Sequence, residues 1–201
     1  MDSAGLDLYW IPLGADTPVV EFSGRIYEAI HAATRRHPRC DLYHAALVAR
    51  QGSASTIVES APVPDDEGRR DRGVVAEGAV GSRVLGRFRV FRYEVRRWPG
   101  GSIPDLAHAV ASPVRITDDD ELVRRSLETL ASVPTPVWGR DELRTGDMWN
   151  SNSVVSWMLT SVGLLGAAGS PPPGGRAPGW HAGIHVAERS TSGCLEVFRT
   201  R

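Results

Sequence analysis

The residues with the clearest chemical potential are a serine, a histidine and a glutamate that lie far apart in the chain. Ser153 stands in the segment Asn150-Ser151-Asn152-Ser153-Val154-Val155, and His44 stands in a nearly apolar run. A serine hydroxyl becomes an effective nucleophile when a histidine accepts its proton, and a carboxylate can orient that histidine. Ser153, His44 and Glu59 are therefore the candidate catalytic residues, as nucleophile, base and orienting group of an acyl-transfer reaction.

A helix has to present the nucleophile. Asn150, Ser151 and Asn152 are all favourable N-cap residues, and an apolar stripe follows them as far as Gly163. The first turn lies at the positive end of the helix dipole, which favours a developing oxyanion by about 0.3–1 kcal/mol. This contribution is far too small to ionise a serine, so a base is required. Ser151 is a second candidate nucleophile if the helix begins earlier than Ser153 requires.

A strand has to present the base. Residues 41–49 form a nearly apolar run typical of a central strand, and His44 is its interior ionisable side chain. A tight turn follows, and residues 55–60 are expected to return as the second strand of a hairpin. This hairpin places Glu59 roughly opposite His44, although a shift of one residue would send Glu59 to the other face. Glu94 is a weaker candidate for the orienting group.

The remaining segments predict further strands and helices around this pair. The expected elements are a strand at residues 6–13, a helix at 22–36, an exposed loop at 62–72, a strand at 87–98 and a helix at 118–131. The glycines of residues 73–82 favour a loop over a strand. Residues 106–110 suggest a short helical turn.

The C-terminal third combines a glycine- and proline-rich loop with a histidine pair. Residues 169–180 are expected to be a surface connector or a wall of the substrate pocket. Residues 180–187 are expected to form a strand. His181 and His185 would share one face of that strand, but they would lie about 13 Å apart. This separation is too large for one metal ion, so no metal site is predicted.

Length, charge and cysteine content limit the classes of protein. The chain has 201 residues and a net charge of −1, and all its basic side chains other than histidine are arginines. We expect one domain over residues 1–201, with no binding to nucleic acid or membrane. Cys40 and Cys194 do not form a disulfide framework, and no signal peptide is visible. These features predict a soluble, cytoplasmic protein.

Two segments resemble motifs of a known superfamily. Tyr43-His44-Ala45-Ala46-Leu47-Val48 resembles the histidine strand of the circularly permuted NlpC/P60-like (papain-like) superfamily, which includes the lecithin:retinol acyltransferase-like proteins. Asn152-Ser153-Val154-Val155-Ser156-Trp157-Met158-Leu159 resembles the Asn-Cys helix start of that family. Permuted members place the histidine strand first and the nucleophile helix late. The strand that contains Glu59 lies where the family has its third polar residue, and the resemblance spans residues 41–165.

The main departure from the family is that its cysteine is Ser153 here. A papain-like site uses a thiolate–imidazolium pair, and a free thiol ionises near pH 8.5, as a rough guide. A serine cannot form that pair at rest, so it needs general-base catalysis by a well-oriented histidine. The substitution therefore implies either a changed mechanism or the loss of catalysis with the pocket retained.

The resemblance implies an α+β papain-like domain with an antiparallel sheet and a packed helix that carries the nucleophile. We expect a hydrolase or acyltransferase that acts on an amide, ester or thioester of a small molecule or peptide, without a cofactor. Asn152 or backbone amides at the helix start would stabilise the oxyanion. The residues expected to contact substrate are Trp149, Asn150, Asn152 and Trp157.

Two alternatives remain open at this point. The first is a catalytically inactive domain of the same fold that binds a small molecule or peptide. The second is a structural or interaction domain, in which Trp149, Trp157 and Trp180 are core residues. The oligomeric state is not predicted.

Overall fold

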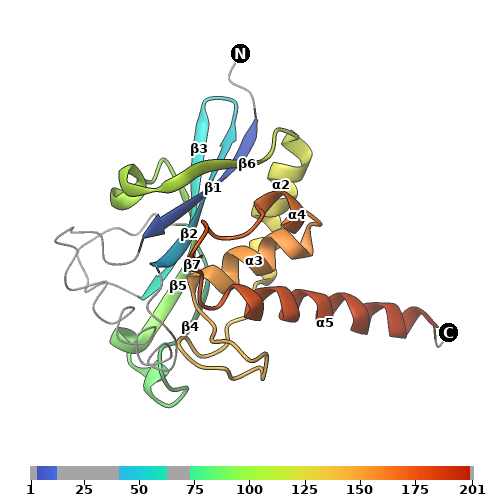
Figure 1. Cartoon of the computed structure of the whole chain (residues 1–201). Coiled ribbons are helices and arrows are strands. Elements are labelled where there is room, and N and C mark those ends of the chain that lie inside the picture. The colour runs from blue at the N-terminus through green and yellow to red at the C-terminus, as the bar shows by residue number, and fades with distance from the viewer. Residues whose placement is uncertain (1–3, 13–40, 63–72, 200–201) are drawn as a thin grey trace.

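The computed structural model describes residues 4–12, 41–62 and 73–199 (Figure 1). The helix expected at 22–36 lies outside these ranges. So does the loop expected at 62–72, except for its first residue. Leu13, the last residue of the strand expected at 6–13, also lies outside the described ranges.

An antiparallel sheet forms one layer of the fold. Its strands are β1 (Gly5–Pro12), β2 (Asp41–Gln51), β3 (Ala54–Pro62), β4 (Val74–Ala79), β5 (Arg92–Pro99) and β6 (Val110–Thr117), in the order β4-β5-β3-β2-β1-β6. Each neighbouring pair in this order is antiparallel. A short strand, β7 (Gly175–Arg176), pairs in parallel with the first residues of β2. The predicted strands at 6–13, 41–49 and 55–60 are confirmed.

The helices lie on one side of this sheet (Figure 1). They are α2 (Asp120–Thr129), α3 (Ser151–Ser161), α4 (Leu165–Ala168) and α5 (Trp180–Arg199). The side chain of Asp119 caps α2 by accepting a hydrogen bond from the Leu122 N–H, which confirms the helix predicted there. An antiparallel sheet with helices packed on it is an α+β architecture, as predicted.

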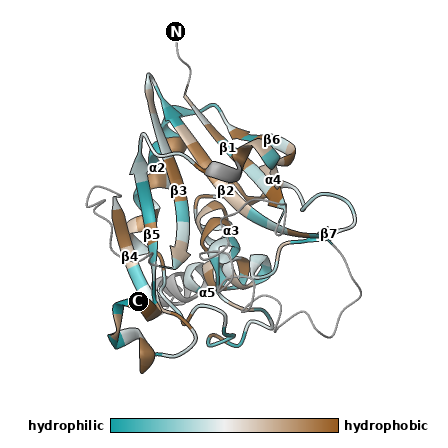
Figure 2. Ribbon diagram, turned by 90° about the vertical axis from the view of Figure 1, so that its left-hand side faces the viewer, coloured by the Kyte–Doolittle hydropathy of each residue, from teal (hydrophilic) through white to brown (hydrophobic). Residues whose placement is uncertain are grey.

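The central strands bury both of their faces. On β1, Leu6, Leu8 and Trp10 face the helices, while Tyr9 and Ile11 face a smaller cluster on the other side. Strand β2 divides its residues in the same way, because side chains alternate along a strand. Figure 2 shows how hydrophobic residues concentrate on β1 and β2. This double burial explains why the sequence around His44 is a nearly continuous apolar run.

The strand predicted at residues 180–187 is wrong, because this segment is the start of α5. Ala182, Gly183, Val186 and Ala187 are all buried, and their spacing gives a stripe of small residues along one helix face. Gly183 lies so close to α3 that an added Cβ would collide with the backbone oxygen of Ser153 and the hydroxyl of Ser156. The spacing of apolar residues in this segment fits a strand as well as a helix. Packing of its buried face against α3 favours the helix.

Three other expectations for secondary structure need correction. The strand predicted at 87–98 begins only at Arg92, because residues 85–91 form two short 3-10 turns. The loop favoured at 73–82 contains β4, whose glycine Gly78 packs directly against the ring of Tyr93. The helical turn expected at 106–110 is present as Pro104–His108, but the sequence reading missed β6, which follows it.

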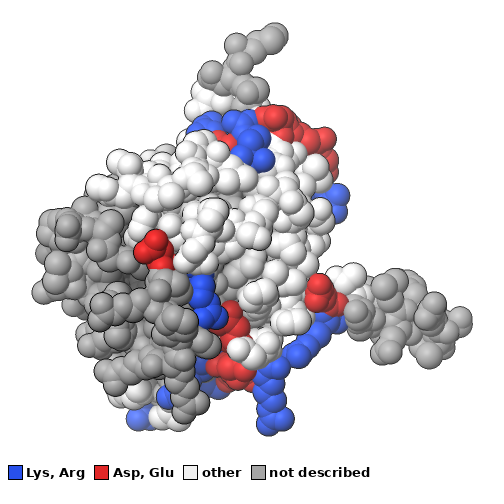
Figure 3. Space-filling view, in the orientation of Figure 1, with Lys and Arg blue, Asp and Glu red and all other residues white. Residues whose placement is uncertain are grey.

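Charged side chains are distributed in mixed groups. Asp7 on β1 is only 1 % exposed, and it forms ion pairs with Arg50 of β2 and Arg115 of β6. On the face shown in Figure 3, basic and acidic side chains of the described residues lie next to one another. This arrangement agrees with the net charge of −1.

Candidate active site

The structure brings His44 and Ser151 together across 107 positions of sequence. The distance from His44 Nδ1 to Ser151 Oγ is 2.7 Å, which is a normal hydrogen-bond distance. Ser151 is the first residue of α3 and is 5 % exposed, while His44 on β2 is half-buried. A hydroxyl and an imidazole in this relation have the geometry that a serine nucleophile and its base require.

A gap in the sheet makes room for this contact. The described ladder between β2 and β3 runs from Leu47–Val58 to Gln51–Ala54, so the first half of β2 lies beyond it. There Asn152 acts as the partner of β2. Its Oδ1 accepts from the Ala45 N–H at 2.7 Å, and its Nδ2 donates to the Tyr43 carbonyl at 3.0 Å.

These two hydrogen bonds flank His44 on the strand. Asn152 directly follows Ser151 in the chain, and His44 lies between Tyr43 and Ala45. Pairing Asn152 with the backbone on both sides of His44 therefore brings Ser151 to the imidazole. The start of α3 is fixed against β2 by polar contacts as well as by apolar packing.

The predicted contact between Ser153 and His44 is not what the structure contains. Ser153 is fully buried, and its Oγ accepts a hydrogen bond from the Asn150 N–H at 3.0 Å. The same oxygen lies 2.8 Å from the Gly179 carbonyl, to which it can donate. Asn150 accepts in turn from the Asn152 and Ser153 N–H groups, which completes a capping box. Because the helix begins at Ser151, the alternative nucleophile Ser151 faces the histidine and Ser153 holds the helix start.

The two carboxylates considered as orienting groups both lie beside Arg96 of β5. Glu59 on β3 is opposite Arg96 in the sheet, with 3.6 Å between its Oε2 and Arg96 Nη1. Glu94 is 6 % exposed, and its Oε2 accepts from Arg96 Nε at 2.8 Å. In the sheet Glu94 pairs with Ala61 of β3. The assignment of either glutamate as the partner of His44 stays a prediction.

The four residues expected to contact substrate are buried, and they pack in the core or hold α3 in place. Trp149 and Trp157 are 2 % and 5 % exposed and belong to the main hydrophobic core. Asn150 caps α3, and Asn152 binds β2; each is 1 % exposed. Burial of these side chains follows from the way α3 enters the sheet, since its first turn lies inside the fold.

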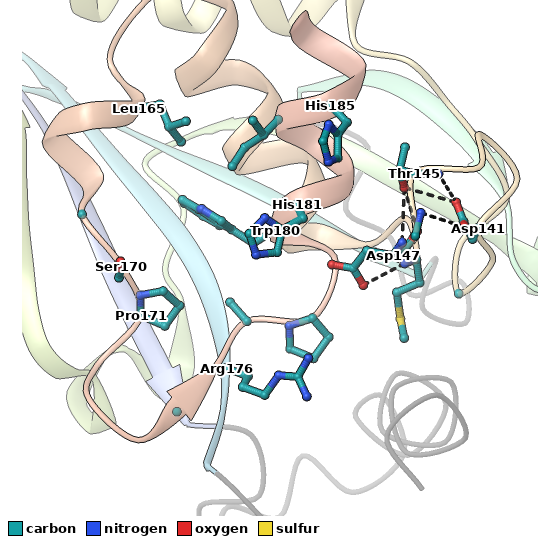
Figure 4. Close-up of a pocket in the computed structure, with 18 residues that line it drawn as sticks. Asp141, Thr145, Asp147, Leu165, Ser170, Pro171, Arg176, Trp180, His181 and His185 are labelled. Carbon is teal, nitrogen blue, oxygen red and sulfur yellow. Dashed lines mark hydrogen bonds between the residues drawn. The ribbon is translucent and has the colours of Figure 1, made fainter. Parts of the chain in front are cut away.

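A pocket of about 870 Å³ lies close to the start of α3, with Met148 and Pro178 among its lining residues (Figure 4). Neither Ser151 nor His44 lines it. Its wall includes the loop at 169–178, the first turns of α5 and the segment from Asp141 to Met148. Asn150 Nδ2 and Asn152 Nδ2 both donate to the carbonyl of Pro178, at 2.8 and 2.9 Å. Pro178 lines the pocket. The residues before and after Ser151 therefore both hydrogen-bond to the wall of the pocket.

Asp147 joins the same two parts of the site. Its Oδ2 accepts from the Gly179 N–H at 2.7 Å, and its Oδ1 accepts from the Met148 N–H at 2.9 Å. Burial raises the pKa of this carboxyl above its ordinary value, and the two N–H donors oppose that effect. The sequence reading did not single out Asp147, because an aspartate after glycine resembles any loop residue. It did propose the loop at 169–180 as a wall of the pocket.

The pocket also receives His181 and His185, which lie one turn apart on α5. The separation of about 13 Å was expected for a strand, and it does not apply because the segment is a helix. Within the described ranges, however, no group of three or more His, Cys, Asp or Glu side chains could hold a metal ion. Of the helices among the described residues, none has the length and apolar character to cross a membrane.

Comparison of the chain with protein-family models, with curated proteins and with solved structures finds no match.

Proposed function

We propose that the protein is a hydrolase or acyltransferase that acts on an amide, ester or thioester through an acyl-enzyme on Ser151. The observation that carries this proposal is the 2.7 Å contact between Ser151 Oγ and His44 Nδ1 at the first residue of a helix. Neither residue is needed there for capping, since Asn150 and Ser153 already form the capping box.

The reaction proceeds in two steps. Ser151 Oγ attacks the acyl carbon while its proton moves to His44 Nδ1, and the protonated histidine then gives that proton to the leaving group. Water or a second acceptor attacks the resulting ester on Ser151 in the same way. The N–H groups of Asn152 and Ser153 already donate to the side-chain oxygen of Asn150. The amide of Ser151 itself is therefore the first-turn donor we assign to the oxyanion.

We further propose that the chain belongs with the permuted NlpC/P60-like proteins. The order of the elements supports this, because the histidine strand β2 precedes the nucleophile helix α3. With Ser151 as nucleophile, Asn150-Ser151 takes the place of the family's Asn-Cys pair, two residues before the match made from sequence. A cytoplasmic location and a reaction without cofactor remain part of this proposal.

A fluorophosphonate probe tests the assignment, because it reacts with activated serines. We expect Ser151→Ala to abolish labelling of the full chain and His44→Ala to reduce it strongly. Ser161→Ala is a matched control, since Ser161 is exposed at the other end of α3. Ser153→Ala should lower stability by about 1–2 kcal/mol through loss of the cap, yet keep labelling. Labelling that survives Ser151→Ala but not Ser153→Ala would refute the assignment.

A binding domain without catalysis is the second candidate function. It is favoured by the 5 % exposure of Ser151 and by a serine at the family's cysteine position. Absence of labelling in the wild-type protein, together with ligand binding in the neighbouring pocket, would support this second candidate.

A further inference from the structure

The 870 Å³ pocket has a charge arrangement that selects one kind of ligand. Two carboxylates line it, and both are engaged by backbone N–H groups. Asp147 accepts from Met148 and Gly179, and Asp141 accepts from Thr145 and Gly146. Part of the hydrogen-bonding capacity of each carboxylate is thus used by the protein itself.

The basic groups of the pocket are available to a ligand. Arg176 on β7 and His181 on α5 are exposed side chains that line the pocket. Within the described part of the chain, neither forms an ion pair or donates a hydrogen bond, although the charges of both oppose the rise in the pKa of Asp147 in the same pocket. A guanidinium in this situation can bind a carboxylate through two parallel hydrogen bonds. In Figure 4, Arg176 and His181 lie on neighbouring walls of the pocket.

The rest of the pocket is largely apolar. Trp180 is 6 % exposed and packs against Trp10 of β1 in a tilted arrangement, with 4.9 Å between ring centroids, so its position is fixed. Leu165, Ile184 and Met148 add aliphatic surface. A pocket of this size with an apolar wall and a few polar groups is typical of small-molecule sites.

We propose that this pocket binds an apolar group that carries a free carboxylate, with Arg176 as the main anion-binding residue. Its position suggests which part of a substrate it holds. Arg176 pairs in the sheet with Leu42, two residues before His44, and Met148 lies three residues before Ser151. The substrate is then an amide, ester or thioester in which one side of the scissile bond ends in an apolar carboxylate. This subsite role rests on the proposed function, whereas carboxylate binding does not.

The test measures binding to the full-length Ser151→Ala protein, so that turnover plays no part. Isothermal titration calorimetry compares hexanoate with hexanamide, and N-acetylphenylalanine with its amide. In at least one pair we expect the acid to bind about tenfold more tightly or better, as a charge-assisted hydrogen bond provides. The preferred acid shows whether the pocket suits a fatty acyl or an aminoacyl group.

Arg176→Gln should remove the preference for the acid, and His181→Gln should reduce it. Arg125→Gln is the matched control, because Arg125 is an exposed arginine of α2 that does not line the pocket. Equal binding of acids and amides, no binding of either, or an unchanged preference in Arg176→Gln would each overturn the proposal. Carboxylate binding without fluorophosphonate labelling would refute the enzyme and leave the pocket assignment intact. Fluorophosphonate labelling without carboxylate binding would refute the pocket assignment and leave the proposed enzyme intact.

Discussion

The side-chain oxygen of Asn152 accepts a 2.7 Å hydrogen bond from the backbone N–H of Ala45, at a point of β2 beyond its described ladder with β3. With the companion bond to Tyr43, this amide replaces a strand partner. It thereby sets the position of α3 relative to His44.

Asn152→Ala should therefore damage both stability and the site. The substitution leaves the Ala45 N–H and the Tyr43 carbonyl without this partner, while the Pro178 carbonyl keeps its hydrogen bond from Asn150. We expect the free energy of unfolding to fall by about 2–4 kcal/mol. Urea denaturation measures this loss, and fluorophosphonate labelling of the folded fraction should slow. Gln51→Ala, which removes an amide with an exposed hydrogen bond, should change stability by less than about 0.5 kcal/mol. Similar losses in both variants would contradict the role of Asn152.

Ser151→Cys should create a thiol of low pKa. A thiol beside an imidazole at a helix N-terminus ionises below the value of about 8.5 found for a free cysteine. The rate of alkylation by iodoacetamide, followed against pH, gives this pKa. Cys40 and Cys194 are replaced by serine to remove background. Adding His44→Ala should return the midpoint towards that of a free thiol, and an unchanged midpoint would show that His44 does not act on this position.

Gly183→Ala should destabilise the protein through the contact between α3 and α5. The added methyl would meet the backbone oxygen of Ser153 and the hydroxyl of Ser156, so one helix has to move. We expect a loss of about 1–3 kcal/mol, as for other overpacked cores, measured by thermal or urea unfolding. Gly166→Ala in α4 is the matched control. It has open space around the new methyl and should be neutral or gain up to about 1 kcal/mol. A neutral Gly183→Ala variant would argue against this tight contact.

Asp147 should make stability depend on pH with a defined sign. Burial raises the pKa of this carboxyl in the folded protein above its ordinary value of 3.8. Between these two pKa values the folded state binds more protons than the unfolded state, so stability falls as pH rises through that window. Urea unfolding of the wild type and of Asp147→Asn across this range measures the difference. The variant lacks this titration, so its stability relative to the wild type should improve with rising pH. A relative stability that declines as pH rises would reverse the assigned shift.

The amino-acid sequence alone predicted strands β1, β2 and β3, helices α2 and α3, and the two segments that form the candidate site. The apolar run around His44 predicted the central strand, and the cap residues before Val154 predicted the nucleophile helix. These features are local, because burial pattern and capping act over a few residues. The sequence could also narrow the nucleophile to Ser151 or Ser153.

The choice between those two serines depends on contacts that form only in the folded chain. Their difference depends on where the helix starts, which the capping box of Asn150 and Ser153 fixes, and on the bonds of Asn152 to β2. The strand predicted at residues 180–187 was wrong for a similar reason, since the pattern of the segment fits both periods and its packing on α3 favours the helix α5. The pocket forms where the segment from Asp141 to Met148 meets residues 169–185, as in the hydrogen bond from the Gly179 N–H to Asp147, and contacts between such distant segments have no local signature in the sequence.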